Sequence, residues 1–292
     1  MGKCLRMCMW ALVLSLVLPG TSLALNKDPI VFVHGLGGST SDFDDMRTFF
    51  TTNYATRDDD GIVHMTLDES SWDVTELYTF GYESCWDSMN TAASDLNTMI
   101  NNIITTTGKP RVDIIAYSLG SVVSRYYLKK YPDAKNKVDA WISLAGPNHG
   151  VDGWDFLWMC SLFGCTGACA MNPNGNVITY LDSEADGGQT PQNLYWDPVN
   201  CEWYWFPRYF TVRSEADTVA VLNGSSIEAV HLWVLTTHNV LTDTWLSTYP
   251  EEWRVSIPHT EFLDSKNTTF WQHLMYYAYL HNFVPGHPGF KD

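Results

Sequence analysis

Residues 112–120 read Val-Asp-Ile-Ile-Ala-Tyr-Ser-Leu-Gly and join a short apolar run to a helix-forming segment that ends before Pro132. Such a run is typical of a strand buried on both faces of a parallel sheet. In a nucleophile elbow, a serine occupies a strained turn between strand and helix, so its neighbours must be small. Ala116 and Gly120 meet this requirement. The strand-turn-helix context therefore predicts that Ser118 is a nucleophile rather than a helix cap.

Other apolar runs place this turn within a sheet. Between residues 33 and 112, apolar residues recur at helical spacing from Trp86 to Ile103, and Gly108 stands where a C-terminal cap belongs. Strands that alternate with helices predict an α/β fold with a mostly parallel sheet, flanked by helices on both faces. The other predicted strands span residues 30–33, 138–144, 209–212 and 228–235.

A serine hydroxyl needs a base that accepts its proton, and an acid that orients this base. In the elbow architecture these partners follow the serine in the order Asp or Glu, then His, each on a loop after a later strand. Asp217 follows the strand predicted at 209–212, and His238 follows the strand predicted at 228–235. We therefore expect Ser118, Asp217 and His238 to form a catalytic triad.

Two backbone N–H groups are expected to form an oxyanion hole. Leu119, at the start of the helix, supplies one of them. The glycine-rich turn at residues 34–38 follows the first strand at the same edge of the sheet, and Leu36 is expected to supply the other. The ring of His34 lies at a strand end before Ser118, so we expect it to make a structural hydrogen bond.

Other acidic residues and histidines remain as alternatives. Three aspartates are expected in surface or turn positions, namely Asp139, Asp182 and Asp186. His149 precedes any acceptable acid, and His231 falls inside a predicted strand. Four histidines lie too late in the chain to follow the last predicted strand directly: His259, His273, His281 and His287.

The first 24 residues have the pattern of a secretory signal peptide. Lys3 and Arg6 precede an apolar run, and Ser22-Leu23-Ala24 follows it as a cleavage site. The run is shorter than the ~20 residues that a membrane-spanning helix needs, and no later stretch is apolar enough to span a membrane. The expected product is one secreted domain of residues 25–292.

Cleavage would leave five cysteines in an oxidising compartment: Cys85, Cys160, Cys165, Cys169 and Cys201. Disulfides are favoured over a zinc site, because no ligand-spaced histidine accompanies the cluster. The odd number predicts one thiol that is free or paired between chains. Asn223 and Asn267 begin glycosylation sequons, which suit a secretory route.

The formal net charge of −16 argues against a nucleic-acid partner and against anionic lipid headgroups. A Trp- and Cys-rich insertion occupies about residues 151–206, and Trp154, Leu157 and Trp158 recur there at helical spacing. These side chains are expected either to form a lid or acyl-binding wall over Ser118 or to complete the core. Neutral acyl esters are the favoured substrates, and a lipid–water interface is a candidate place of action.

Several motifs resemble the secreted class 2 lipases, the bacterial lipase A type and its larger actinobacterial relatives. The resemblance implies an α/β-hydrolase fold that hydrolyses carboxylic esters, often of glycerol with fatty acids, without a metal or cofactor. It also implies Ser118 as nucleophile, Asp217 as acid, His238 as base, and Leu36 and Leu119 as oxyanion-hole residues. The matching segments are residues 29–38, 112–120, 143–150, 213–217 and 237–238.

Two positions depart from that family's pattern. Tyr117 stands where the family commonly has His, and Ser121 stands where a second Gly is usual. Both changes are expected to alter packing and access rather than chemistry.

Taken together, these features predict a secreted serine ester hydrolase, most consistent with a triacylglycerol lipase or esterase that acts through an acyl-enzyme. Two alternatives stay open. The same triad serves polyester depolymerases and acyltransferases. A secreted lipid- or carbohydrate-binding protein with a vestigial triad is the alternative from another class.

Overall fold

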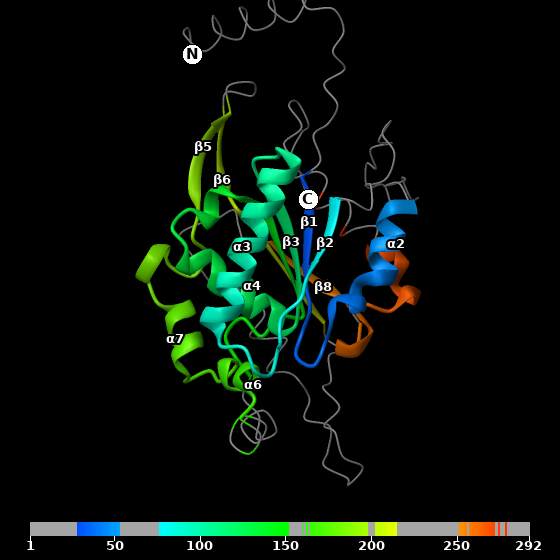
Figure 1. Cartoon of the computed structure of the whole chain (residues 1–292), viewed down its shortest axis with the longest axis vertical. Helices are drawn as coiled ribbons and strands as arrows, with labels where there is room; N and C mark the ends of the chain where they lie inside the picture. Colours follow the sequence, from blue (N-terminus) through cyan, green and yellow to red (C-terminus); the bar gives the residue numbers. More distant parts are fainter. Residues whose placement is uncertain are drawn as a thin grey trace, which may run out of the picture.

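The computed structural model describes residues 28–52, 76–151, 160, 162, 164–197, 202–214, 251–255, 257–271, 274 and 278. A six-stranded sheet has the order β2-β1-β3-β4-β7-β8, and all five neighbouring pairs in it are parallel (Figure 1). Its strands are β1 (Ile30–Val33), β2 (Leu77–Phe80), β3 (Val112–Tyr117), β4 (Val138–Leu144), β7 (Arg208–Ser214) and β8 (Glu251–Val255).

β1, in the interior of the sheet, is buried on both faces, as its continuous apolar run predicts. Val31 and Val33 belong to one apolar cluster, whereas Ile30 and Phe32 belong to another, because successive strand residues point to opposite faces. All four side chains are fully buried. Full burial of one such side chain contributes about 1.5–3 kcal/mol, so both faces stabilise the fold.

Helices cover each face of the sheet (Figure 1). On one face, α3 (Met89–Thr107) and α4 (Leu119–Lys130) contact each other and share a cluster with β1 and β3. On the other face, α2 (Asp44–Thr52) packs with the helical residues 268–271. This arrangement confirms the predicted α/β-hydrolase fold.

The local sequence determines where α3 begins and ends. The Ser88 hydroxyl accepts a hydrogen bond from the Thr91 N–H, which satisfies a free donor at the helix start. Gly108 ends the helix at φ 70°, a left-handed conformation that suits glycine, as the sequence predicts. Trp86, which shares the apolar spacing, precedes the helix and is 65% exposed.

The insertion between β4 and β7 contains its own secondary structure. The described part holds two short helices, α6 (Thr166–Ala170) and α7 (Asn176–Asp182). An antiparallel hairpin follows, formed by β5 (Asn193–Asp197) and β6 (Glu202–Phe206). The insertion is therefore more regular than the loop-like segment that its sequence suggests.

Within the described residues, no helix is both long enough and apolar enough to cross a membrane. The signal peptide, the strand predicted at 228–235 and Asn223 lie outside the described residues, and the signal peptide and glycosylation stay predictions.

Candidate active site

Ser118 forms the turn between β3 and α4, as the sequence predicts. Its backbone has φ 52° and ψ −125°, a strained conformation for a residue other than glycine. The helix after this turn packs tightly against the end of β1, because a Cβ on Gly120 would lie only 2.6 Å from the His34 carbonyl oxygen. The small residue at 120 is thus required by the elbow itself.

The imidazole of His259 lies directly beside the serine. His259 Nε2 is 3.0 Å from Ser118 Oγ, within hydrogen-bonding distance. The two residues are 8% and 9% exposed, so this contact is largely shielded from water. Tyr117 holds the histidine backbone, because its hydroxyl donates to the His259 carbonyl oxygen at 2.6 Å. The serine and its neighbour in sequence therefore both contact the histidine.

His259 thus lies where a base was expected, beside the nucleophile. The prediction that His259 comes too late in the chain to follow the last strand is wrong, because β8 ends at Val255 and pairs with β7, and His259 follows it on a short 3₁₀ helix, η5 (His259–Glu261). His259 thus has the strand-then-loop placement that a catalytic base requires. His238 and Asp217 both lie outside the described residues.

The sequence signal for β8 is weak for a physical reason. Its residues read Glu-Glu-Trp-Arg-Val, without the continuous apolar run of the central strands. It is the last strand in the order of the described sheet, where burial on both faces is not needed. A search for apolar runs alone therefore misses both β8 and the histidine that follows it.

The glycine-rich turn after β1 lies against the nucleophile. A Cβ on Gly35 would be 2.9 Å from Ser118 Cβ and 3.4 Å from its Oγ, so the backbone approaches the hydroxyl closely. The Gly37 N–H is already engaged, since it donates to Ser84 Oγ at 2.8 Å. Leu36 and Leu119 come together beside Gly167 of α6. The side chains of both predicted oxyanion residues thus pack against the same glycine of α6.

His34 makes structural contacts, as expected. Its Nδ1–H donates to the Gly35 carbonyl oxygen at 2.9 Å, and its ring stacks on Tyr82 at a centroid distance of 4.5 Å. The Tyr82 hydroxyl in turn donates to the His34 carbonyl oxygen at 2.8 Å. These contacts fix the start of the turn, and among the described residues His259 is the histidine within hydrogen-bonding distance of Ser118.

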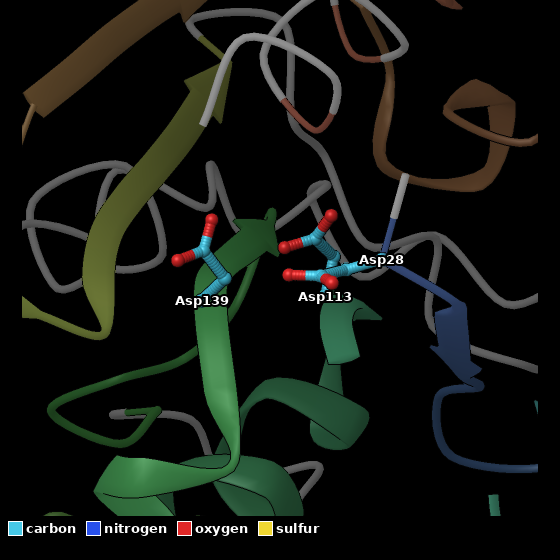
Figure 2. A group of neighbouring side chains, drawn as sticks. All are labelled: Asp28, Asp113 and Asp139. Carbon is cyan, nitrogen blue, oxygen red and sulfur yellow. The ribbon is translucent and has the colours of Figure 1, made fainter. Parts of the chain in front are cut away.

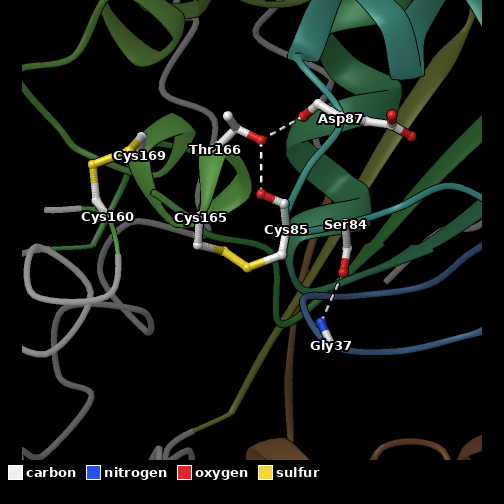
Figure 3. The surroundings of a disulfide bond; sticks show 8 residues. All are labelled: Gly37, Ser84, Cys85, Asp87, Cys160, Cys165, Thr166 and Cys169. Carbon is white, nitrogen blue, oxygen red and sulfur yellow. Dashed lines mark hydrogen bonds between the residues drawn. A yellow bond between two sulfur atoms is a disulfide. The ribbon is translucent and has the colours of Figure 1, made fainter. Parts of the chain in front are cut away.

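Two disulfides border this region. Cys85 pairs with Cys165, and Cys160 pairs with Cys169 (Figure 3). The expected disulfide chemistry is confirmed for these four cysteines, while Cys201 lies outside the described residues. The expected substrate-binding residues Trp154, Leu157 and Trp158 also lie outside them, and they stay a prediction.

A second group of side chains, the pair of His149 and Asp182, lies in the insertion and has a structural role. His149 Nδ1 donates to Asp182 Oδ2 at 2.9 Å, and Asp182 Oδ1 lies 3.2 Å from the guanidinium of Arg125. Burial raises the pKa of Asp182, but the hydrogen bond from His149 and the charge of Arg125 outweigh it, so the pKa is lowered. Arg125 is fully buried and also donates to the carbonyl oxygens of Leu181 and Gln189. The pair thus ties the insertion to α4.

A third group of side chains, Asp28, Asp113 and Asp139, clusters near the amino ends of β1, β3 and β4 (Figure 2). One oxygen from each lies within 4.8 Å of the others, and all three side chains are buried. Asp139 is therefore not the surface or turn residue that its sequence position suggested. At about 3.3 Å per strand residue, Asp113 lies roughly 16 Å from Ser118, near the opposite end of β3.

Three carboxylates at this spacing form a donor set that suits a hard cation such as Ca²⁺. The protein supplies positive charge of its own, however, since Arg111 Nη1 lies 3.7 Å from Asp139 Oδ1. Burial raises the pKa of Asp139 to about 6, against the opposing charges of Arg111 and Arg208. Burial likewise raises the pKa of Asp28 to about 8. The cluster thus bears on stability rather than on the chemistry at Ser118.

Solved structures of lipases share this fold. A Bacillus licheniformis lipase, BlEst2 in mature form, is 16% identical, with a TM-score of 0.55 over 88% of this chain and 95% of that one. Lipase B of Aspergillus fumigatus is 12% identical, with a TM-score of 0.52 over 93% of this chain and 68% of that one. At such low identity these likenesses support the fold alone.

The sequence model of one known protein family also matches this chain. The palmitoyl protein thioesterase model matches residues 29–208, which include β1, the glycine-rich turn and the Ser118 elbow. The match covers more than half of the chain. This protein is a serine ester hydrolase with the α/β-hydrolase fold, and it belongs to the palmitoyl protein thioesterase family.

Proposed function

We propose that the protein hydrolyses neutral fatty-acyl esters, with Ser118 as nucleophile, His259 as base and Asp217 as the acid that orients the base. The observation that carries this proposal is the 3.0 Å separation of Ser118 Oγ and His259 Nε2 at a strained strand-to-helix turn. Asp217 is included because it follows β7 in the chain, and the order Ser118, Asp217, His259 is the one this architecture uses.

The reaction follows from these roles. His259 Nε2 accepts the Ser118 proton while Oγ attacks the acyl carbonyl, and the N–H groups of Leu119 and Leu36 stabilise the oxyanion. His259 then donates that proton to the departing alcohol, which leaves an acyl-enzyme on Ser118. Water attacks the acyl-enzyme with His259 as base, and the fatty acid leaves.

Two exposed apolar side chains, on segments that a disulfide joins, favour an apolar substrate. Trp86 and Leu162 are 65% and 64% exposed. Trp86 is next to Cys85, and Leu162 lies three residues before Cys165, so the Cys85–Cys165 disulfide joins their segments. The net charge of −16 disfavours anionic headgroups, which leaves neutral esters such as triacylglycerols.

The family match favours a second substrate, a fatty-acyl thioester. The same triad and oxyanion hole serve both, because a thiolate is a better leaving group than an alkoxide. We also propose that the protein is secreted, since the two disulfides suit an oxidising compartment.

The proposal is tested by purifying the wild type with Ser118→Ala, His259→Ala, His238→Ala and Asp217→Asn. Each protein is assayed on triolein, p-nitrophenyl palmitate and a palmitoyl thioester, and its unfolding temperature is measured. We expect losses of about 10⁴-fold in kcat for Ser118→Ala and His259→Ala, and at least about 10²-fold for Asp217→Asn. His238→Ala is the matched control and should retain its activity.

Two outcomes would change the assignment. Loss in His238→Ala together with full activity in His259→Ala would move the base to His238. A folded wild type that neither hydrolyses these substrates nor reacts with a fluorophosphonate probe at Ser118 would favour a binding protein. Product analysis with an added alcohol separates hydrolysis from acyl transfer, and a polyester substrate tests depolymerisation.

A further inference from the structure

We propose that Ser84 is a positioning residue for the oxyanion hole, and that the Cys85–Cys165 disulfide anchors it. The proposal rests on the proposed function, because it assumes that the turn at residues 34–38 stabilises the oxyanion formed at Ser118.

Ser84 makes a long-range contact with that turn. Its Oγ accepts a hydrogen bond from the Gly37 N–H at 2.8 Å, across 47 residues of sequence, and the side chain is 7% exposed. This bond fixes the peptide plane between Leu36 and Gly37. The peptide plane before Leu36 is held locally, because the Gly35 carbonyl oxygen accepts from His34 Nδ1–H and from the Gly38 N–H. Ser84 thus holds the other side of Leu36 from a distant segment, at a glycine that has no side chain to restrict it.

The segment that carries Ser84 is itself held firmly. The next residue, Cys85, is bonded to Cys165 at the start of α6 (Figure 3). The Thr166 N–H donates to the Cys85 carbonyl oxygen at 2.6 Å, and the Thr166 hydroxyl lies 2.9 Å from the same oxygen and 2.8 Å from the Asp87 carbonyl oxygen. One covalent bond and these hydrogen bonds therefore join the segment to α6.

The first turn of α6 also contacts the oxyanion residues. A Cβ on Gly167 would overlap the Ser84 carbonyl oxygen, and it would lie 2.7 Å from Leu119 Cδ2 and 3.2 Å from Leu36 Cδ1. Gly167 is buried, so its close approach to all three residues is part of the packed interior. Ser84, Leu36 and Leu119 thus all pack against Gly167 of α6. The Cys85–Cys165 disulfide joins α6 to the segment that carries Ser84.

The other disulfide provides a matched control. Cys160 and Cys169 are nine residues apart, so their bond closes a loop within the insertion. The Cys85–Cys165 bond instead spans 80 residues and joins two elements of the site. Although Cys169 lies in α6, only the long-range disulfide joins α6 to the Ser84 segment, so its loss should affect the oxyanion hole more.

The test compares Ser84→Ala with an exposed control on α3, Ser94→Ala, in the full chain with its disulfides intact. Each variant is assayed for kcat and KM on p-nitrophenyl palmitate, and for inhibition by an alkyl trifluoromethyl ketone. Such a ketone adds to the nucleophilic serine and forms an oxyanion. Ser84→Ala should lower kcat about five- to tenfold, as expected for loss of one neutral hydrogen bond. The inhibition constant should rise by the same factor, with KM within about twofold.

A second comparison tests the anchor. The double variant Cys85→Ala/Cys165→Ala should lower kcat at least as much as Ser84→Ala, whereas Cys160→Ala/Cys169→Ala should stay within about twofold of wild type. Unchanged kcat in Ser84→Ala, or a fall in kcat without weaker inhibition, would overturn the positioning role, whether or not the cysteine variants fold. Equal effects of the two disulfide deletions would overturn the anchor. If the wild type itself is inactive, the proposed function fails instead.

Discussion

Replacement of Asp139 by asparagine should remove part of the decrease in the free energy of unfolding that we expect as the pH rises. Asp139 is 1% exposed, and burial raises its pKa from 3.8 to about 6 despite the nearby charge of Arg111. A shift of about 2 units corresponds to about 3 kcal/mol between the protonated and ionised forms. Because the Asp139 side chain is so deeply buried, water screens its charge only weakly.

The direction follows from linkage. An aspartate whose pKa is raised on folding favours the folded state while it is protonated. That stabilisation is complete below about pH 4 and is lost as the pH rises through 6. Asp28, whose pKa burial raises to about 8, extends the loss to higher pH. The amide of Asp139→Asn mimics the protonated acid at every pH, so the variant avoids its own share of the loss.

The assay is urea unfolding, followed by tryptophan fluorescence between pH 4 and pH 8 with the disulfides intact. The free energy of unfolding of Asp139→Asn, relative to wild type, should rise by about 3 kcal/mol between pH 4 and pH 7.5. Asp95→Asn, an exposed change on α3, should show no such trend. A difference between Asp139→Asn and wild type that stays constant with pH, or that falls, would refute the reasoning.

Three further substitutions address the site and its supports. Gly120→Ala places a methyl group against the carbonyl oxygen of His34, and should lower the free energy of unfolding by about 1–3 kcal/mol in a denaturation curve. Tyr117→Phe removes the hydrogen bond to the His259 carbonyl oxygen but keeps the ring, so kcat should fall about fivefold while KM is unchanged. Arg125→Met leaves buried carbonyl oxygens without a donor, and should cost about 3 kcal/mol in thermal unfolding. Wild-type behaviour in any of these would contradict the corresponding contact.

The central part of the fold could be predicted because burial on both faces leaves a clear pattern. β1 is a continuous apolar run, β3 and β4 are mostly apolar, and the elbow needs small residues that the sequence displays. The end of α3 at Gly108 could also be predicted, because a left-handed helix cap favours glycine.

The rest depends on packing between distant segments, which leaves little local trace. β8 is the last strand in the order of the described sheet and carries charged residues, so its sequence does not resemble a buried strand. Without β8, the sequence places His259 too far after the last predicted strand to be a base. Ser84 acquires its role only when the turn at Gly37 is brought beside it. Asp139 resembles a surface aspartate in sequence, although the fold buries it against two other acids.

The place of β8 in the sheet has a consequence for the order in which the site is made. The nucleophile belongs to β3 in the interior, whereas the histidine beside it arrives after the last strand of the described sheet. During synthesis, a chain that has emerged only as far as β7 holds the elbow but has no His259 to accept the serine proton. With His259 in its proposed role as base, turnover must await the docking of residues 251–259, so the nucleophile elbow alone is silent.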